Sequence, residues 1–292
     1  MDKYYTKPCN FYFGIQSKKK VINRQSLPLG GDKFISFDKI EIISRKSKKT
    51  ISLSEIKKLP IGVKKKVKKD LKIVTQPKIF HKNFNFKKIP NIMGILNITP
   101  DSFSDGGKFL TNKSAIKQLK FLFKCGANIV DIGGESTRPG SKAVSSNVEW
   151  NRIKNILKKI KKQEVISLDT RKSDIMEKGI KLGVKLINDV SGLNFDKNSV
   201  NILKKYRTPF VLQHSLDTPE LMQKNPKYKN VLLDIYDFFE DGINKIKSKK
   251  IILDPGIGFG KNLKHNLTLI SKISLFHSLG FPILIGTSRK RF

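Results

Sequence analysis

The chain has 292 residues and a formal net charge of +35, from 59 Lys and Arg against 24 Asp and Glu. Its apolar fraction of 38 % is enough for a sizeable core, which excludes wholesale disorder. No apolar run reaches the roughly 20 residues of a membrane span, the N-terminus has no signal-peptide core, and only two cysteines are present. These features exclude a membrane protein, a secreted disulfide scaffold and a zinc finger, and we expect a cytoplasmic protein.

Over half of the excess positive charge lies in residues 1–90, which hold 24 basic and 6 acidic side chains. A nucleic-acid or anionic-membrane surface is one explanation. The basic residues are mostly Lys, however, whereas base readout and bidentate phosphate contacts favour Arg. We favour a generally lysine-rich composition without a membrane or nucleic-acid partner, whose positive field attracts small anionic substrates.

Residues 1–90 differ in pattern from the rest of the chain. Polar and apolar residues alternate weakly over 34–43 and 48–54, as they do in short strands, and lysine runs such as 64–70 lie around them. The pattern predicts a small strand-rich N-terminal module that ends near Pro90.

Residues 91–292 show a regular alternation of short apolar runs and amphipathic stretches. The stretches at 116–126 and 231–246 have helical periodicity, and Cys125, on the first of them, is expected in the core. Continuous apolar strands between helices indicate a parallel sheet that is covered on its outside. The apolar runs are NIMGILNI, NIVDIGG, VISLDT, VKLINDV, PFVLQH, KIILDPG and PILIGTS.

Seven such β/α units fit either a doubly wound sheet or a (β/α)8 TIM barrel. Almost every run ends in a polar side chain, and in a barrel every strand can contribute one to a common mouth. A doubly wound sheet concentrates its site at one switch point instead, so we favour the barrel. Because the sequence ends at Phe292, just after the seventh run, we expect a barrel that lacks its last unit.

Polar side chains at the strand ends are the strongest functional signal. Asn97, Asp169, Asn188 and Asp254 each follow an apolar run. Any one of them alone is explained as a satisfied structural hydrogen-bonder. Several converging on one mouth suit a flat, nitrogen-rich heterocycle, because carboxylates accept pairs of N–H donors and Asn both donates and accepts. We interpret His214, also at a strand end, as structural.

Three loops add further candidates. The loop after the first run, 98–109, holds Asp and Phe and is interpreted as a lid, or alternatively as a helix cap. Thr137 and Arg138 follow two glycines and can donate to an anionic oxygen. Ser288 and Lys290 follow the seventh run, where barrels often bind phosphate. The glycine string at 256–260 lacks the acidic partner of a dinucleotide fold.

These motifs together resemble one family. NITPDSFSDGG, DIGGESTRPGS, SLDT, INDVSGL, LDPGIGFGKN and SRK occur in the order found in dihydropteroate synthases, over about 200 residues from Asn91. The resemblance implies a pterin-binding barrel in folate biosynthesis. It would condense (7,8-dihydropterin-6-yl)methyl diphosphate with 4-aminobenzoate and release diphosphate, with Mg2+ as cofactor.

The resemblance also implies roles for the pterin and diphosphate sites. Asp169, Asn188 and Asp254 would bind the pterin. Asn97 would meet the diphosphate and its metal ion, and so is the expected metal-contacting residue. Arg138, a catalytic residue by this resemblance, would stabilise the departing diphosphate.

The remaining implied roles concern 4-aminobenzoate and the closing loop. Lys290 would be shared by pterin and aminobenzoate and is expected to be catalytic, with Thr137, Ser288 and Phe259 around the aminobenzoate. On the first loop, Asp105 would steady the pterin cation as a catalytic residue and Phe103 would exclude water. The implied mechanism is dissociative, with early C–O cleavage before the amine attacks.

Two departures from the family pattern stand out. The family's Arg-x-His segment on strand eight has no counterpart here, which makes a truncated, inactive pterin-binding protein one alternative; a pterin-dependent methyltransferase is another. Gln213 stands where an apolar residue packing on the pterin would be expected. The implied partners are small-molecule substrates, and a homodimer is one assembly that the resemblance allows.

Overall fold

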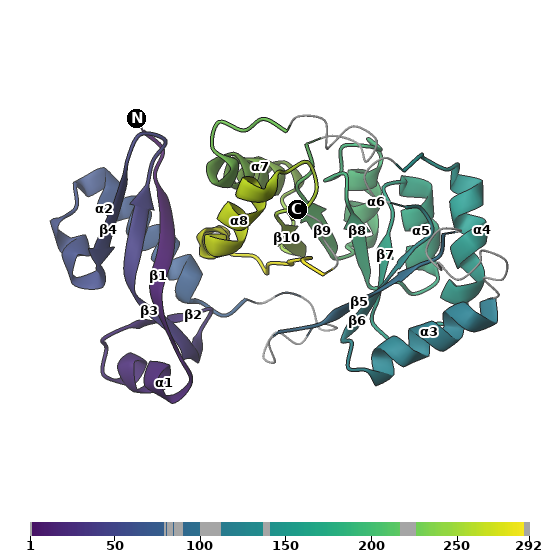
Figure 1. Ribbon diagram of the computed structural model, residues 1–292, viewed down its shortest axis with the longest axis horizontal. Helices are drawn as coiled ribbons and strands as arrows, with labels where there is room; N and C mark the ends of the chain where they lie inside the picture. The colour runs from purple at the N-terminus through teal and green to yellow at the C-terminus, as the bar shows by residue number, and fades with distance from the viewer. Residues whose placement is uncertain are drawn as a thin grey trace. The chain divides into compact units, whose positions relative to one another are not determined.

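The computed structural model describes residues 2–78, 80, 84, 90–99, 112–136, 141–216 and 226–288. The chain divides into two compact units (Figure 1). The first contains residues 1–79, 228–240 and 263–283, and the second contains residues 80–227, 241–262 and 284–292. The boundary near Pro90 stays a prediction, because few residues between 79 and 90 are described.

The N-terminal residues form an antiparallel sheet, which confirms the predicted strand-rich module. β3 is central and pairs with β1 along one edge. Along its other edge β3 pairs with β2 near its start and with β4 near its end. Phe37 and Ile40 on β3 are fully buried against Val67 of α2, so the lysine run at 64–70 belongs to an amphipathic helix. The elements are β1 (Tyr5–Phe13), α1 (Gly14–Ile22), β2 (Leu27–Leu29), β3 (Asp32–Ile43), β4 (Lys48–Ser52), the 3-10 helix η1 (Leu53–Lys58) and α2 (Ile61–Thr75).

This sheet packs on segments from late in the sequence, the first part of α7 (Val231–Ile246) and the 3-10 helix η3 (Ile273–Leu279), and α8 (Leu263–Ser271) belongs to the same unit. The Tyr5 ring meets the Tyr236 ring edge to face at 5.0 Å. The Asp237 carboxylate accepts from Lys3 Nζ at 2.6 Å, Arg45 Nη2 at 2.7 Å and the Tyr5 hydroxyl at 2.8 Å. Burial raises the pKa of Asp237, but these three donors outweigh it and lower the pKa.

The second unit is built on a parallel sheet whose strands lie side by side in chain order, β5 to β10. A doubly wound sheet reverses its strand order at a switch point, whereas a (β/α)8 barrel does not, so this order confirms the barrel topology. The strands are β5 (Met93–Asn97), β6 (Ile129–Gly133), β7 (Ile166–Asp169), β8 (Leu186–Asp189), β9 (Phe210–Gln213) and β10 (Ile251–Asp254).

The seventh apolar run makes only the beginning of a strand. Ile283 is an isolated bridge residue, and the Leu284 N–H donates to the Leu253 carbonyl at 2.8 Å. The run therefore lies next to β10, in the position expected for the following barrel strand.

Helices cover the outer face of the sheet (Figure 1). The Leu168 side chain packs so close to Gly179 of α5 (Ser173–Lys181) that a Cβ at Gly179 would lie 2.4 Å from Leu168 Cδ2. Leu212 of β9 packs in the same way on Gly242 of α7. Both helices come close because glycine has no side chain. The remaining helices of this unit are α3 (Asn112–Lys124), α4 (Ser146–Leu157) and α6 (Ser199–Tyr206).

The inner face of the sheet changes from apolar to polar along the strands. Near the strand starts it is apolar, with Ile129, Leu186, Val211 and Ile252 in one cluster under Phe84. Because side chains alternate between faces, the residues two and four positions further along lie on the same inner face. Those positions are polar in most strands, and they lie at the carboxyl ends of the sheet.

One core prediction is wrong. Cys125 is exposed, not buried, because α3 ends at Lys124 and the chain turns at Gly126, which has a φ of +98°. The predicted helices at 116–126 and 231–246 are otherwise present as α3 and α7. Within the described residues, every helix is too short or too polar to cross a membrane.

Candidate active site

The strand register places four predicted or adjoining residues in one row. Asn97 pairs with Gly133, Gly133 with Asp169, and Asp169 with Asn188. Paired residues in parallel strands point to the same face, at about 4.8 Å from strand to strand. The structure therefore brings Asn97, Asp169 and Asn188 together at one end of the sheet.

Gly133 keeps this row open at its centre. A Cβ at this position would lie 3.3 Å from Asn97 Oδ1 and 3.4 Å from Asp169 Oδ2. The side-chain oxygens of Asn97 and Asp169 thus face the same small space from the strands on either side. This arrangement gathers oxygen atoms that can accept hydrogen bonds around a gap that a ligand atom can enter.

Asp131 is a member of the site that the sequence-based candidates omitted. It lies one inward position before Gly133, and its Oδ2 accepts from Asn188 Nδ2 at 2.8 Å. That bond fixes the Asn188 amide with its oxygen free: among the described residues, Asn188 Oδ1 and Asp169 Oδ1 are buried without a hydrogen-bond partner. Buried polar atoms are normally paired, so these acceptors are positioned for a ligand. The signal was a carboxylate in the middle of an otherwise apolar strand.

Burial shifts the acidity of these carboxyl groups. It raises the pKa of Asp169 well above its ordinary value, and the nearby charge of Asp131 raises it further. Burial also raises the pKa of Asp131, against the lowering effect of Ser167 and Asn188. Two buried carboxyls this close resist ionising together, and a ligand rich in N–H groups would relieve that cost.

On β9 and β10 the polar side chains lie two residues beyond this row, since Asn188 pairs with Val211 and Val211 with Ile252. Asp254 pairs with Gln213, and Asp254 Oδ1 accepts from the Gly256 N–H at 2.7 Å. Gly256 has a φ of +66°, and a Cβ there would lie 2.0 Å from the His214 carbonyl oxygen, so only glycine fits. This turn holds the Asp254 carboxylate at the strand end.

Lys261 ties the following loop to the end of β9. It is buried, and its Nζ lies 3.2 Å from His214 Nδ1 and donates to the Phe259 carbonyl at 2.8 Å. Burial lowers the pKa of His214 well below its ordinary value, and Lys261 lowers it further, so the imidazole is neutral. The structural role of His214 stays a prediction, and Phe259 is held half-exposed on the loop after β10.

A buried ionic cluster supports two of the loops. Glu135, two residues before Thr137, accepts from Arg171 Nε at 3.1 Å and Lys172 Nζ at 3.0 Å. Lys172 also contacts the fully buried Glu149 of α4 at 2.5 Å. Burial raises the pKa of Glu135, but its N–H and cationic donors outweigh this and lower it. The cluster links the loops after β6 and β7 to α4.

Several predicted site residues fall outside the described residues: Phe103, Asp105, Thr137, Arg138 and Lys290. Ser288 is described and exposed, and it makes no hydrogen bond with the strand-end residues in the part of the chain that is described. The roles of all predicted site residues stay predictions.

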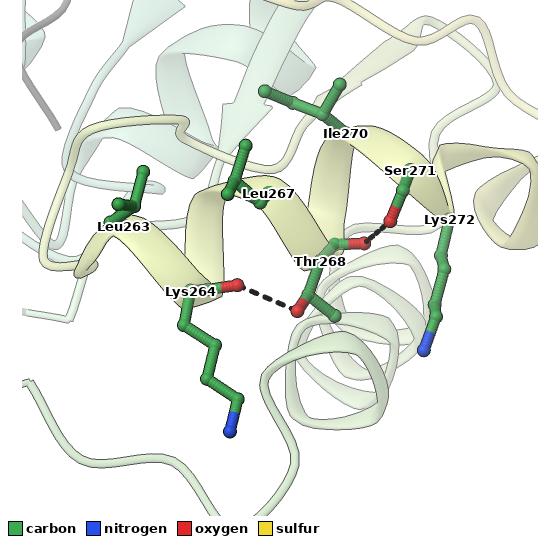
Figure 2. A pocket seen from close by; sticks show the side chains of 7 residues that line it. All are labelled: Leu263, Lys264, Leu267, Thr268, Ile270, Ser271 and Lys272. Atoms are coloured by element: carbon green, nitrogen blue, oxygen red, sulfur yellow. Dashed lines mark hydrogen bonds between the residues drawn. The ribbon is translucent and has the colours of Figure 1, made fainter.

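A shallow groove on α8 lies apart from this chemistry (Figure 2). Leu263, Leu267 and Ile270 line it, and the hydroxyl groups in it donate to the helix itself, Thr268 Oγ1 to the Lys264 carbonyl at 2.7 Å. None of the strand-end side chains contributes to its lining. The groove is a surface feature and not the candidate active site.

Comparison with known proteins agrees with the site's chemistry. The family described as pterin binding enzyme matches residues 93–292. The dihydropteroate synthase of Clostridium beijerinckii is 44 % identical over 220 residues, covering 73 % of this chain and 79 % of that protein. That of Escherichia coli K12 is 39 % identical over 208 residues, covering 69 % and 73 %.

The chain is also similar to solved structures of dihydropteroate synthases. Yersinia pestis dihydropteroate synthase with a sulfonamide drug has a TM-score of 0.67 at 37 % identity, covering 71 % of this chain and 77 % of that one. The Xanthomonas albilineans enzyme in complex with 7,8-dihydropteroate has a TM-score of 0.61 at 32 % identity, covering 69 % and 74 %. The chain therefore belongs to the pterin binding enzyme family, in its dihydropteroate synthase branch.

Proposed function

We propose that this chain condenses (7,8-dihydropterin-6-yl)methyl diphosphate with 4-aminobenzoate to give 7,8-dihydropteroate and diphosphate in folate biosynthesis. The observation that carries the proposal is the row of strand-end oxygens with unpaired acceptors on Asp169 and Asn188, together with Asp254 at the carboxyl end of β10 in the same sheet. A pterin ring presents N–H groups along its edge, and these are the donors that such acceptors lack.

The described residues would bind and orient the ring. Asn188 is held by Asp131, so its oxygen is fixed before the ligand arrives, and Asp254 is held by the Gly256 N–H. Preorganised groups of this kind need no rearrangement during the reaction. Thr137, Arg138, Ser288 and Lys290 would hold the diphosphate and the aminobenzoate, and Asp105 and Phe103 would close over the reacting carbon.

A magnesium ion is part of the proposal. Among the described residues no three His, Cys, Asp or Glu side chains are grouped to hold a metal by themselves. The Asn97 amide oxygen, half-exposed and facing the gap at Gly133, is a hard donor of the type that suits Mg2+ completed by diphosphate oxygens. When bound, the ion would neutralise charge on the departing diphosphate. Calorimetric titration of diphosphate with and without Mg2+ checks this, and Asn97→Ala would weaken the metal-dependent part.

The finer assignments are also proposals. A cytoplasmic location is supported by the free thiols of Cys9 and Cys125, which suit a reducing compartment. A homodimer is supported by the exposed apolar face of α8, and light scattering measures it.

The turnover test compares two reactions. With pterin diphosphate and 4-aminobenzoate, dihydropteroate and diphosphate should form in equal amounts, and with a methylfolate donor no methyl transfer should occur. The methyltransferase alternative is not favoured, since the relatives and structures described above are dihydropteroate synthases. Methyl transfer without condensation would reject the proposal.

A further inference from the structure

The side chain of Gln213 has no role in the fold that accounts for its position. It is 3 % exposed, at the last residue of β9, and its Nε2 has no hydrogen-bond partner among the described residues. An unpaired buried amide is costly, so its presence at a strand end with Asp254 and Asn188 requires an explanation.

Register places Gln213 beside Asp254 and one inward position beyond Asn188. Gln213 pairs with Asp254 on β10. On the other side, Val211, two residues earlier on the same face, pairs with Asn188 of β8. The Gln213 amide therefore lies on the inner face with the strand-end row, and not among the helices outside.

The unpaired atoms of this row differ in kind. Asp131 Oδ1, Asp169 Oδ1 and Asn188 Oδ1 are acceptors, whereas Gln213 Nε2 is a donor. A ligand that satisfies them all must offer several N–H groups and at least one acceptor beside them. The 2-amino-4-oxopyrimidine edge of a pterin has this order: the 2-amino group, the N3–H, and then the 4-oxo oxygen.

We propose that Gln213 donates a hydrogen bond from Nε2 to the 4-oxo oxygen of the pterin and so selects 4-oxo over 4-amino pteridines. Asp254 accepts from the 2-amino and N3–H groups, and the neighbouring strand supplies the donor for the next atom along the ring edge. The inference rests on the proposed function and adds to it the group that recognises the ring's carbonyl.

A 4-amino ring places N–H groups where Gln213 also presents a donor. Sites built to hydrogen-bond a group reject analogues that lack it, because the buried partner stays unpaired. Wild type should therefore bind the 4-oxo ring roughly tenfold to a hundredfold more tightly than the 4-amino ring.

Calorimetry tests this with 6-hydroxymethylpterin and its 2,4-diamino counterpart. The 4-amino ring also lacks the N3–H from which Asp254 accepts, so Asp254 contributes to the preference in every variant. In Gln213→Met, which keeps the side chain's length without its donor, the preference should fall roughly tenfold from that of wild type, since one hydrogen bond is lost. Leu212→Met is the matched control: it lies on the same strand but packs outward on Gly242, and it should keep the wild-type preference.

A second variant tests the same inference if Gln213→Met does not fold. Gln213→Glu is nearly isosteric, and its carboxylate can accept from the 4-amino group, so the preference should fall further than in Gln213→Met. An unchanged preference in either folded variant, or no preference in wild type, would overturn the inference while the proposed function stands. If wild type binds neither ring, the proposed function fails and the inference falls with it.

Discussion

At the scale of single residues, the site is defined by which polar atoms the fold leaves unpaired. Asp131 and Gly256 use their polar groups to fix Asn188 and Asp254, so the side chains that face the gap are held in place by others. The sequence predicted the fixed residues, because each ends an apolar run. It did not predict the residues that fix them, because a hydrogen bond between positions 131 and 188 depends on strand register, which composition does not reveal.

Asp254→Asn should weaken pterin binding by roughly tenfold to a hundredfold, since a hydrogen bond to a charged group contributes about 1.5–3 kcal/mol. The amide oxygen can still accept from the Gly256 N–H, so the turn is preserved. Calorimetry with 6-hydroxymethylpterin measures the loss, and circular dichroism confirms the fold. Wild-type affinity in the folded variant would remove Asp254 from the site.

Asp189 gives a pH-dependent prediction. Burial raises its pKa to about 6, despite hydrogen bonds from Ser191. A carboxyl group whose pKa is higher in the folded state stabilises the fold at low pH, and this contribution is lost between about pH 4 and 6. A shift of about two units corresponds to at most about 3 kcal/mol.

The variant Asp189→Asn does not titrate at this position but keeps an oxygen for the Ser191 donors. Its stability relative to wild type should therefore increase as the pH rises from 4 to about 6 and stay constant above about 7. Urea unfolding at several pH values measures the difference. A difference independent of pH would show that Asp189 has an ordinary pKa.

At the scale of elements, strands and helices were largely predictable and their partners were not. The alternation of apolar runs with amphipathic stretches predicted β5 to β10 and α7 because packing on both faces of a parallel sheet demands that pattern. The lysine run of α2 was not predicted as a helix, since its apolar face is sparse and is completed by β3. The helix α2 is therefore stabilised mainly by its packing on β3 and not by its own sequence pattern.

A buried ionic cluster joins the loops after β6 and β7 to α4, and its contribution to the free energy of unfolding can be measured. Its members are Glu135, Glu149, Arg171 and Lys172. Lys172→Met would leave two buried carboxylates short of a cation, which we expect to cost about 3–5 kcal/mol of unfolding free energy. Adding Glu149→Gln removes one of those charges and should recover part of the loss.

A double-mutant cycle on Lys172 and Glu149, measured by chemical denaturation, gives the coupling directly. The Lys178→Met variant on α5 serves as control, since Lys178 pairs with Asp174 on the surface and should cost less than about 1 kcal/mol. Strictly additive effects of Lys172→Met and Glu149→Gln would contradict the proposed cluster.

At the scale of the whole molecule, the net charge of +35 acts on an anionic substrate. A positive field raises the association rate of a diphosphate, and salt screens it. We expect kcat/KM for the pterin diphosphate to fall roughly tenfold between low and high ionic strength. Binding of the uncharged 6-hydroxymethylpterin should barely change. Equal salt dependence for both ligands would show that the fall in kcat/KM does not come from electrostatic attraction of the diphosphate.

The N-terminal module shows how far whole-molecule organisation could be anticipated. Its strands β3 and β4 were predicted and β1 and β2 were not, and its contact with α7 and η3 depends on residues more than 200 positions apart, such as Lys3 with Asp237. Nothing local in the sequence marks such a pair. The barrel order was predictable because each strand end carries its own polar residue.

If the carboxyl ends of β5 to β10 form one pterin site, a crystal structure of the chain soaked with 6-hydroxymethylpterin will show the ring there. We expect the ring on the inner face of the sheet, with its N–H edge on Asp254 and Asn188. A ring bound elsewhere, with both side chains more than about 4 Å from it and so beyond hydrogen-bond distance, would rule out a pterin site at these strand ends.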